Sequence, residues 1–213
     1  MHLLPHRLRA FTLTELLVSL GIVILVVWVL ITPAGSPTRP KAQRIKCINN
    51  LKNLALAMRI YYTDNNPGAS TIGSFTNLAV LRAADYFRAL SNELSTPNIL
   101  ICPADARVVS STNFATLTNR NISYFANVLA STNNTDPSTF LFGDRNLQTN
   151  GVPLASGASL KVVPNLNLGW TGEIHNDSGI IAIGDGSVQQ FSSARLRAML
   201  QNAEVAPNLL LIP

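Results

Sequence analysis

His175 is the residue of this chain best suited to act as a general base, since the other two histidines lie within the first six residues. A histidine beside a carboxylate and a hydroxyl is the arrangement that many hydrolases use, and Asp185 or one of the serines could supply the partner. However, the sequence has no Gly-x-Ser-x-Gly elbow, no His-Glu-x-x-His pair, no Cys-x-x-Cys pair and no phosphate-binding glycine loop. We therefore expect that the protein is not an enzyme.

Asp177 and Asp185 are the residues that could bind Ca²⁺ together with loop carbonyl oxygens. The sequence around them predicts a β-hairpin, with turns at 176–179 and 184–187. The strand between the turns would place His175 and Asp185 about 15 Å apart, at ~3.3 Å per residue, too far for a shared metal or a catalytic dyad. A dense run of carboxylates, as in common calcium loops, is absent from the sequence. We expect no metal or cofactor, with calcium at the two aspartates as the alternative.

Cys47 and Cys102 are the two cysteines of the chain. An even number of cysteines in an exported protein permits one disulfide bond. Two unpaired thiols, one on a helix and one after a strand, are equally compatible with the sequence. Both interpretations stay open here, because spacing does not show whether the two side chains meet.

Glu15 is the one charged residue in the apolar stretch from Phe11 to Ile31. As a helix this stretch would be about 31 Å long, which matches the hydrocarbon core of a bilayer. Arg7 and Arg9 precede it and predict that the N-terminus stays in the cytoplasm, with the C-terminal body outside. A carboxylate in such a helix is costly and needs a partner.

The positive charge of the chain belongs to its N-terminal part. Residues 1–64 carry eight Lys/Arg and two acidic residues, a net charge of +6. Residues 65–213 carry eight Lys/Arg and nine acidic residues, a net charge of −1. A body without excess positive charge argues against nucleic acid as a partner.

The sequence predicts an α+β fold with a jointed N-terminal stem. Prolines and a glycine at 33–40 predict a hinge after the first helix. Apolar residues at helical spacing predict an amphipathic stem helix at 41–63. We expect both helices to pack on a small antiparallel sheet formed by the body, 64–213. The other expected elements are helices within 76–94 and at 194–202, strands at 99–102, 123–129, 139–142, 180–183 and 188–191, surface loops at 131–137 and 151–169, and an apolar tail at 206–213 that packs on the body or on a neighbour.

The junction of Ala10 and Phe11 resembles the processing site of type IV pilins and type II secretion pseudopilins. A small residue is followed by Phe, and Glu15 stands at the fifth position after the cut; glycine is more usual than Ala10 in that family. The resemblance implies that residues 1–10 are a leader removed by a prepilin peptidase and that the new Phe11 amine is methylated. It also implies that 11–32 is a transmembrane helix that becomes the core of a filament.

A second resemblance covers most of the body. His175, nine further residues and Asp185-Gly186 are similar to the H-X9-DG element, here 175–186, of prepilin-associated proteins. In those proteins the element accompanies three other motifs, which in this chain are Cys47–Leu51 (CINNL), Cys102–Pro103 and Ser123–Asn127 (SYFAN). The molecular role of the element is poorly defined, so the resemblance implies a pilin-like fold more than a chemistry.

Glu15 has two interpretations. In a bundle of like subunits, Glu15 of one chain could neutralise the Phe11 amine of its neighbour and so fix their axial offset. Alternatively, Glu15 marks the edge of the helix in the headgroup zone, near Thr12 and Thr14.

We therefore expect a structural subunit, similar to a pseudopilin or minor pilin, of a type II secretion or type IV pilus-like system. It would be a single-pass protein of the inner membrane with its body in the periplasm or outside the cell. Its partners would be the prepilin peptidase, an inner-membrane assembly platform, the lipid bilayer and like subunits packed through the N-terminal helix. An adhesin-like binding module, displayed on a filament or anchored in the membrane, is the alternative.

Overall fold

The computed structural model describes residues 12–31, 38–65, 81–130, 136, 138–201 and 208–213. The chain forms two compact units, Met1–Thr38 and Arg39–Pro213. The predicted cleavage site at Ala10 and Phe11 lies outside the described residues, as does most of the predicted hinge.

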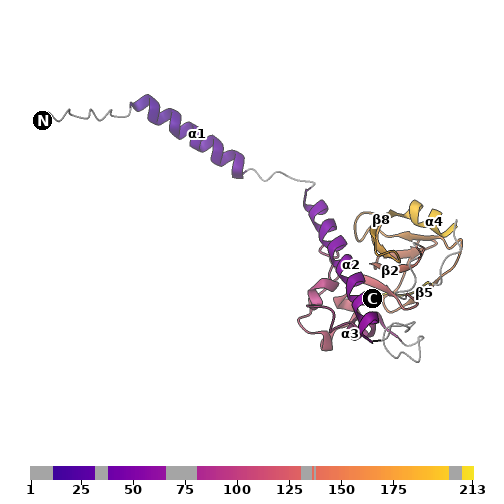
Figure 1. Ribbon diagram of the computed structural model, residues 1–213. Coiled ribbons are helices and arrows are strands. Elements are labelled where there is room, and N and C mark those ends of the chain that lie inside the picture. The colour runs from indigo at the N-terminus through magenta and orange to yellow at the C-terminus, as the bar shows by residue number, and fades with distance from the viewer. Residues whose placement is uncertain (1–11, 32–37, 66–80, 131–135, 137, 202–207) are drawn as a thin grey trace. The chain divides into compact units, whose positions relative to one another are not determined.

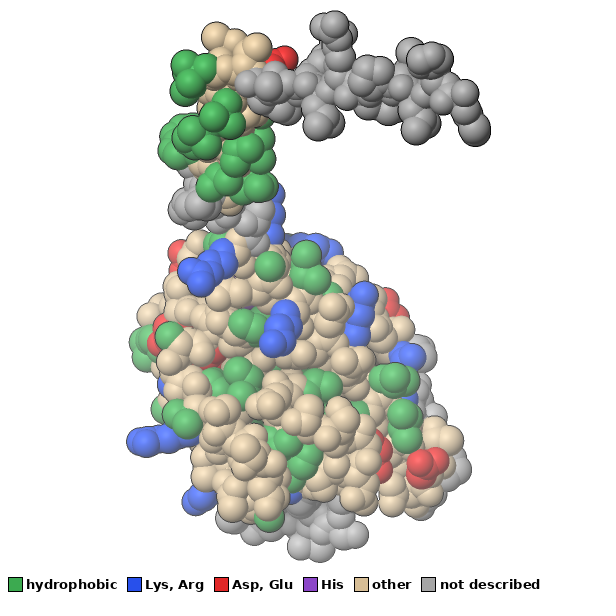
Figure 2. All heavy atoms as spheres, turned by 90° about the vertical axis from the view of Figure 1, so that its left-hand side faces the viewer, with side chains coloured by type: hydrophobic (Ala, Val, Ile, Leu, Met, Phe, Trp, Pro, Cys, Tyr) green, Lys and Arg blue, Asp and Glu red, His purple; other side chains and the backbone are tan. Residues whose placement is uncertain are grey.

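Helix α1, Leu13–Ile31, forms the described part of the first unit (Figure 1). It begins with a capping box, in which the Thr12 hydroxyl accepts a hydrogen bond from the Glu15 N–H at 3.3 Å and the Glu15 carboxylate accepts one from the Thr12 N–H at 3.0 Å. The large apolar side chains from Leu13 to Leu30 are 45–77% exposed in the single chain, and Figure 2 shows them covering the visible side of the helix. The window Leu13–Leu30 has a mean hydropathy of 2.6 and could span a membrane by length and composition.

Helix α2, Thr38–Asn65, is longer at both ends than the predicted stem helix. Pro40 lies in its first turn, where a missing N–H breaks no helical hydrogen bond. The Tyr62 hydroxyl donates to the Ala130 carbonyl at 2.7 Å, and the Asn50 amide donates to the Ile101 carbonyl at 2.8 Å. These bonds hold both halves of the helix to the body. The buried face of the helix has three- and four-residue spacing: Cys47, Leu51, Leu54, Met58 and Tyr62.

The body contains a six-stranded antiparallel sheet with the order β5-β9-β1-β2-β7-β8. Four of its strands confirm predicted ones, whereas β5 lies in a predicted loop and β9 in the apolar tail. The bounds are β1 Tyr124–Asn127, β2 Phe140–Asp144, β5 Ser159–Val162, β7 Ser178–Ile183, β8 Val188–Ser192 and β9 Asn208–Leu211. The fold of the described body is therefore α+β with an antiparallel sheet, as predicted.

A second, three-stranded sheet has the order β4-β3-β6. Its strands are β3 Leu147–Thr149, β4 Val152–Pro153 and β6 Leu168–Trp170. The prediction of a surface loop at 151–169 was therefore wrong for the parts that pair as β4, β5 and most of β6. Short strands interrupted by Asn, Pro and Gly lack the alternating pattern on which a strand prediction depends.

The remaining elements are short helices around the main sheet. Helix α3, Ala83–Ala89, and helix α4, Ser193–Gln201, agree with the predicted helices. The predicted strand at 99–102 was wrong: 3-10 helix η1, Pro97–Leu100, takes its first half, and residues 101–102 do not pair as a strand. Pro97 fixes a helical φ, and the Thr96 side chain accepts from the Asn98 N–H, so this segment turns. Two further 3-10 helices are η2, Phe114–Thr116, and η3, Asn119–Asn121.

The six-stranded sheet separates two hydrophobic cores. Tyr124, Ala126 and Phe142 pack with α2 and α3 on one face, whereas Phe125 and Phe140 pack with Trp170 and α4 on the other. Phe140 and Phe142 would share a face in a regular strand, but the register between β2 and β7 shifts between them. This irregularity places an aromatic ring in each core.

Strand β7 begins at Ser178, inside the predicted turn at 176–179. Gly179 is paired with Phe191 of β8, and a Cβ at Gly179 would lie 2.4 Å from a ring carbon of Trp170. The glycine therefore makes room for the largest buried side chain of the second core rather than forming a turn.

Candidate functional site

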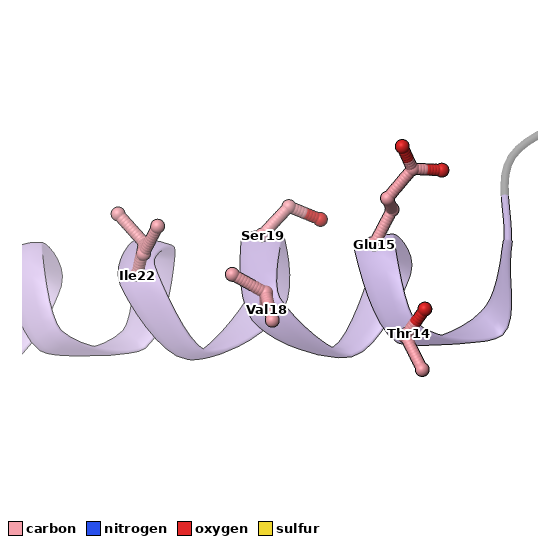
Figure 3. Close-up of a pocket in the computed structure, with 5 residues that line it drawn as sticks. All are labelled: Thr14, Glu15, Val18, Ser19 and Ile22. Carbon is pink, nitrogen blue, oxygen red and sulfur yellow. The ribbon is translucent and has the colours of Figure 1, made fainter.

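The polar N-terminal end of α1 is the first candidate site. Glu15 Oε2 accepts hydrogen bonds from both the N–H and the hydroxyl of Thr12, at 3.0 and 2.9 Å. Figure 3 shows Glu15 and Ser19 one turn apart on the same side of the helix. The two residues belong to a shallow surface lined by Thr14, Glu15, Val18, Ser19 and Ile22. The carboxylate thus has a local partner within its own chain.

The capping box was not predicted from the sequence. Its signal is present as Thr12-x-x-Glu15, with a hydroxyl and a carboxylate three residues apart before an apolar run. The bonds place Glu15 beside Thr12 in the first turn of α1. Both predicted roles of Glu15, at the headgroup zone and with the Phe11 amine of a neighbour, stay predictions, since Phe11 lies outside the described residues.

Cys47 and Cys102 form a disulfide bond, with the sulfurs 2.17 Å and the Cα atoms 5.2 Å apart. The bond joins α2 to the segment that follows η1, and both residues are fully buried. Of the two states compatible with the sequence, the paired one is present. A link across 55 residues restricts the unfolded chain and stabilises the body.

His175 lies against this disulfide. Its Nε2 atom is 3.4 Å from Cys102 Sγ and 3.7 Å from Asp144 Oδ2. Its backbone carbonyl accepts from the Ser178 hydroxyl at 2.6 Å and from the Arg44 guanidinium at 3.2 Å. The structure therefore brings together four parts of the body: α2, the segment after η1, the end of β2 and the turn before β7.

Asp185 and Gly186 lie at the other end of β7, in the turn that leads to β8. Asp185 Oδ1 accepts from the Ser187 N–H at 2.7 Å, and Gly186 has φ 86°. This is the local backbone role expected for both residues. The two ends of the H-X9-DG element thus serve separate turns.

The turn that carries His175 has an unusual backbone. His175, Asn176 and Asp177 have φ values of 56°, 52° and 53°, in the left-handed region that non-glycine residues seldom adopt. The bonds to the His175 carbonyl hold this turn in place. Such a conformation costs about 1–3 kcal/mol per residue and persists only where the surroundings enforce it.

Burial makes both partners of the Asp144–His175 pair neutral at pH 7. Burial raises the pKa of Asp144 to about 8, although the bond from the Ile180 N–H at 2.8 Å opposes this shift. Burial, followed by the positive charge of Arg44, lowers the pKa of His175 to about 4. Asp144 Oδ1 is buried and accepts no hydrogen bond from the described residues.

Residue types that often bind metals meet in the buried cluster of Cys47, Cys102, Asp144 and His175, but the two cysteine sulfurs are bonded to each other. The ligand atoms of Cys47, Cys102 and His175 all lie within 4.8 Å of one another. Neither Asp177 nor Asp185 belongs to a group of three or more such side chains in the described part of the chain. Calcium binding at those two aspartates stays a prediction.

A surface hollow of about 380 Å³ adjoins His175. It lies between the first turns of α2, the segment after Cys102 and the left-handed turn. Arg44 and Glu173 supply its two charged groups. The residues that line it are Pro40, Gln43, Arg44, Pro103, Ala104, Ala106, Glu173, His175 and Asn176.

Comparison of the chain with protein-family models, curated proteins and solved structures gave no match.

Proposed function

We propose that this protein is a structural subunit of a filament, similar to a pseudopilin or minor pilin, that is processed by a prepilin peptidase and assembled through its N-terminal helix. The observation that carries the proposal is the exposure of α1: the large apolar side chains of this helix of 19 residues are 45–77% exposed. Such a helix must be covered by lipid or by other helices. In a filament subunit, lipid would cover the helix before assembly, and the like helices of neighbouring subunits would cover it afterwards.

The N-terminal sequence supports the proposed processing. The basic leader, the Ala10–Phe11 junction and Glu15 together resemble a prepilin site. In this proposal Glu15 pairs with the Phe11 amine of a neighbouring subunit. The capping box uses Glu15 Oε2, so the carboxylate would serve its own helix and the neighbour together.

Two variants separate capping from pairing between subunits. Glu15→Gln removes the charge but keeps a side-chain oxygen that can accept from the Thr12 N–H. Thr12→Val removes the capping hydroxyl but keeps the carboxylate. The measurement is the fraction of each full-length variant that enters sedimentable filaments or cross-linked multimers in cells that contain the assembly machinery, with the N-terminus checked by mass spectrometry.

We expect Glu15→Gln to be processed normally but to reduce assembly by about tenfold or more, which corresponds to ~1.4 kcal/mol per subunit. Thr12→Val should assemble within about threefold of the unaltered protein, since loss of a cap costs ~1 kcal/mol and packing of α1 restores the helix. Normal assembly of Glu15→Gln, or equal losses in both variants, would count against pairing between subunits.

A further inference from the structure

Another surface hollow of the body, of about 740 Å³, is lined by three arginines and one aspartate. It lies between helix α3, the segment that contains η2 and η3, and the loop before β5. We call it the arginine hollow. Its charged groups are Arg82, Arg88, Arg120 and Asp85, and no aromatic side chain lines it among the described residues. Its volume is within the range of sites that bind small organic ligands.

The three segments around the arginine hollow meet at Asn119. Asn119 Oδ1 accepts a hydrogen bond from the Ala84 N–H of α3 at 3.3 Å. A Cβ at Gly157 would lie 3.8 Å from Asn119 Nδ2, so the loop before β5 lies beside the same side chain. The Gly157 N–H donates to the Ile212 carbonyl at 2.8 Å and holds this loop to the C-terminal segment. The walls of the hollow are therefore fixed by the fold of the body.

Arg82 and Arg120 are the two cations of the arginine hollow whose guanidinium groups have no carboxylate partner in the described chain. Asp85 Oδ1 pairs instead with the Arg88 guanidinium, which also donates to the Leu117 carbonyl. Asp85 Oδ2 accepts from the backbone N–H of Arg82 at 3.3 Å. Both Arg82 and Arg120 are exposed. The hollow thus has a net charge of +2, on a body whose residues 65–213 have a net charge of −1.

We propose that the arginine hollow binds a sugar chain that carries carboxylate or sulfate groups. The guanidinium group presents a planar set of donors that matches the oxygens of such anions. The remaining polar groups of the lining are the hydroxyls of Thr118 and Ser156 and the carboxamide of Asn119, which suit the hydroxyl groups of a sugar. The site lies apart from α1 and does not depend on the proposed assembly function. It would give the exported body a ligand of its own.

The lining favours an acidic sugar over other anionic polymers. Single-stranded nucleic acid binds along a positively charged groove with aromatic side chains on which its bases stack, and the arginine hollow is an isolated positive site without aromatic lining. Peptides bind mainly through strand pairing or apolar anchors. The larger apolar side chains of the lining, Ala84 and Leu117, are both buried.

The test measures binding of defined polymers to the immobilised full-length chain in a neutral detergent at 0.15 M salt. Polygalacturonate supplies carboxylate groups and dextran sulfate supplies sulfate groups. Neutral dextran, poly-glutamate and a single-stranded oligonucleotide are the comparisons. We expect at least one acidic polysaccharide to bind at least about tenfold more tightly than poly-glutamate and the oligonucleotide, and neutral dextran not to bind.

The two acidic polysaccharides distinguish the source of the anionic group. Binding of polygalacturonate alone would assign a carboxylated sugar, and binding of dextran sulfate alone would assign a sulfated one. Failure of both to bind would overturn the proposal. Equally tight binding of poly-glutamate or the oligonucleotide would also overturn it, since the hollow would then recognise charge without the sugar.

Variants place the ligand in the arginine hollow. The double variant Arg82→Ala/Arg120→Ala should weaken binding at least about tenfold, because it removes both unpaired cations. Arg39→Ala/Lys41→Ala removes the same charge from exposed positions in the first turn of α2 and is the matched control. It should bind within about twofold of the unaltered chain. Equal affinities of the two double variants would place the polysaccharide elsewhere and contradict the proposal.

Ser156→Glu provides a second test that removes no arginine. Ser156 is exposed at the wall of the hollow, so a carboxylate there should repel an acidic sugar and leave the fold intact. We expect at least about threefold weaker binding, with a melting temperature within about 2 °C of the unaltered chain. Unchanged binding by this variant would show that the polymer does not enter the hollow.

Discussion

Asp144 and His175 show how burial sets charge at single residues in this body. Both side chains lose solvent, which disfavours the carboxylate of one and the imidazolium of the other. The pair at 3.7 Å is therefore neutral at pH 7 and is not a salt bridge. The pair makes the stability of the fold depend on pH, because the folded and unfolded chains bind different numbers of protons at these two residues.

The stability of the oxidised protein should fall between pH 6.5 and 8. Asp144, with its folded pKa raised to about 8, contributes stability below its unfolded pKa that is lost as the pH rises to about 8. His175, with its folded pKa lowered to about 4, contributes stability above pH 6.5 that is lost as the pH falls towards 4. Between pH 4 and 6.5, the stability lost through Asp144 as the pH rises is offset by the stability gained through His175. Above pH 6.5, only Asp144 changes the stability.

Asp144→Asn provides the measurement. The asparagine oxygen can still accept from the Ile180 N–H but does not titrate. Denaturant unfolding of the unaltered chain should lose about 2 kcal/mol from pH 6.5 to 8, at ~1.4 kcal/mol per pH unit, through this residue. The variant should lack this component. An identical pH dependence in both proteins would show that Asp144 is ionised in the folded state.

At the residue scale, the sequence indicated several residues of the buried cluster around His175, but it did not indicate their contacts. Cys47, Cys102 and His175 could be singled out by type. Their association could not be predicted, because 73 residues separate Cys102 from His175 and a left-handed turn directs the histidine. Asp144 was missed because it ends a buried strand, where polar residues usually have structural roles.

At the scale of elements, the C-terminal strand β9 is held by a buried pair of asparagines. Asn208 Oδ1 accepts from the Phe140 N–H at 2.8 Å and from the Asn127 amide at 2.7 Å. The side-chain oxygen Oδ1 of Asn127 in turn accepts from the Leu209 N–H at 2.9 Å. These bonds join β9 to β1 and β2 where the strands end. Strand β9 thus lies inside the sheet, between the edge strand β5 and β1.

Asn208→Ala should destabilise the body by about 2–4 kcal/mol, because it leaves the Phe140 N–H buried without its acceptor. Asn49→Ala, at an exposed position of α2, is the control and should change stability by less than about 0.5 kcal/mol. Urea unfolding of the full-length chain in detergent measures both. Similar midpoints for the two variants would show that Asn208 does not hold β9.

Long, strongly patterned elements were predictable, whereas short strands with distant partners were not. Helix α2 could be predicted from its apolar spacing, and β7 and β8 from a run of apolar residues between turn sequences. The tail was expected to pack, which is confirmed for 208–213, but its place between β5 and β1 was not foreseen. Strand order depends on contacts between segments that local patterns do not encode.

At the scale of the molecule, the chain divides into an apolar N-terminal unit and a body with its own two cores. We predict that a fragment of residues 39–213, exported through a cleavable signal, folds with its disulfide formed and stays in the supernatant after ultracentrifugation. The full-length chain should sediment with membranes, because α1 partitions into lipid. Oxidation state and sedimentation of both proteins can be measured from the same cells.

The full-length variant Ile24→Arg is the control for that experiment. A charge at the centre of the helix costs ~2.5–3.5 kcal/mol on insertion and should reduce the membrane-bound fraction. A fragment of residues 39–213 that sediments as the full-length chain does would show that the body, rather than α1, binds the membrane.

Mass spectrometry of the mature N-terminus tests the proposed function most directly. In cells that contain a prepilin peptidase, we predict a protein that begins at Phe11 and carries a methyl group on its amine. That result would make α1 a retained part of the mature protein, with the amine that Glu15 is proposed to neutralise. A protein that begins near Gly35, or that retains Met1, would contradict the proposal.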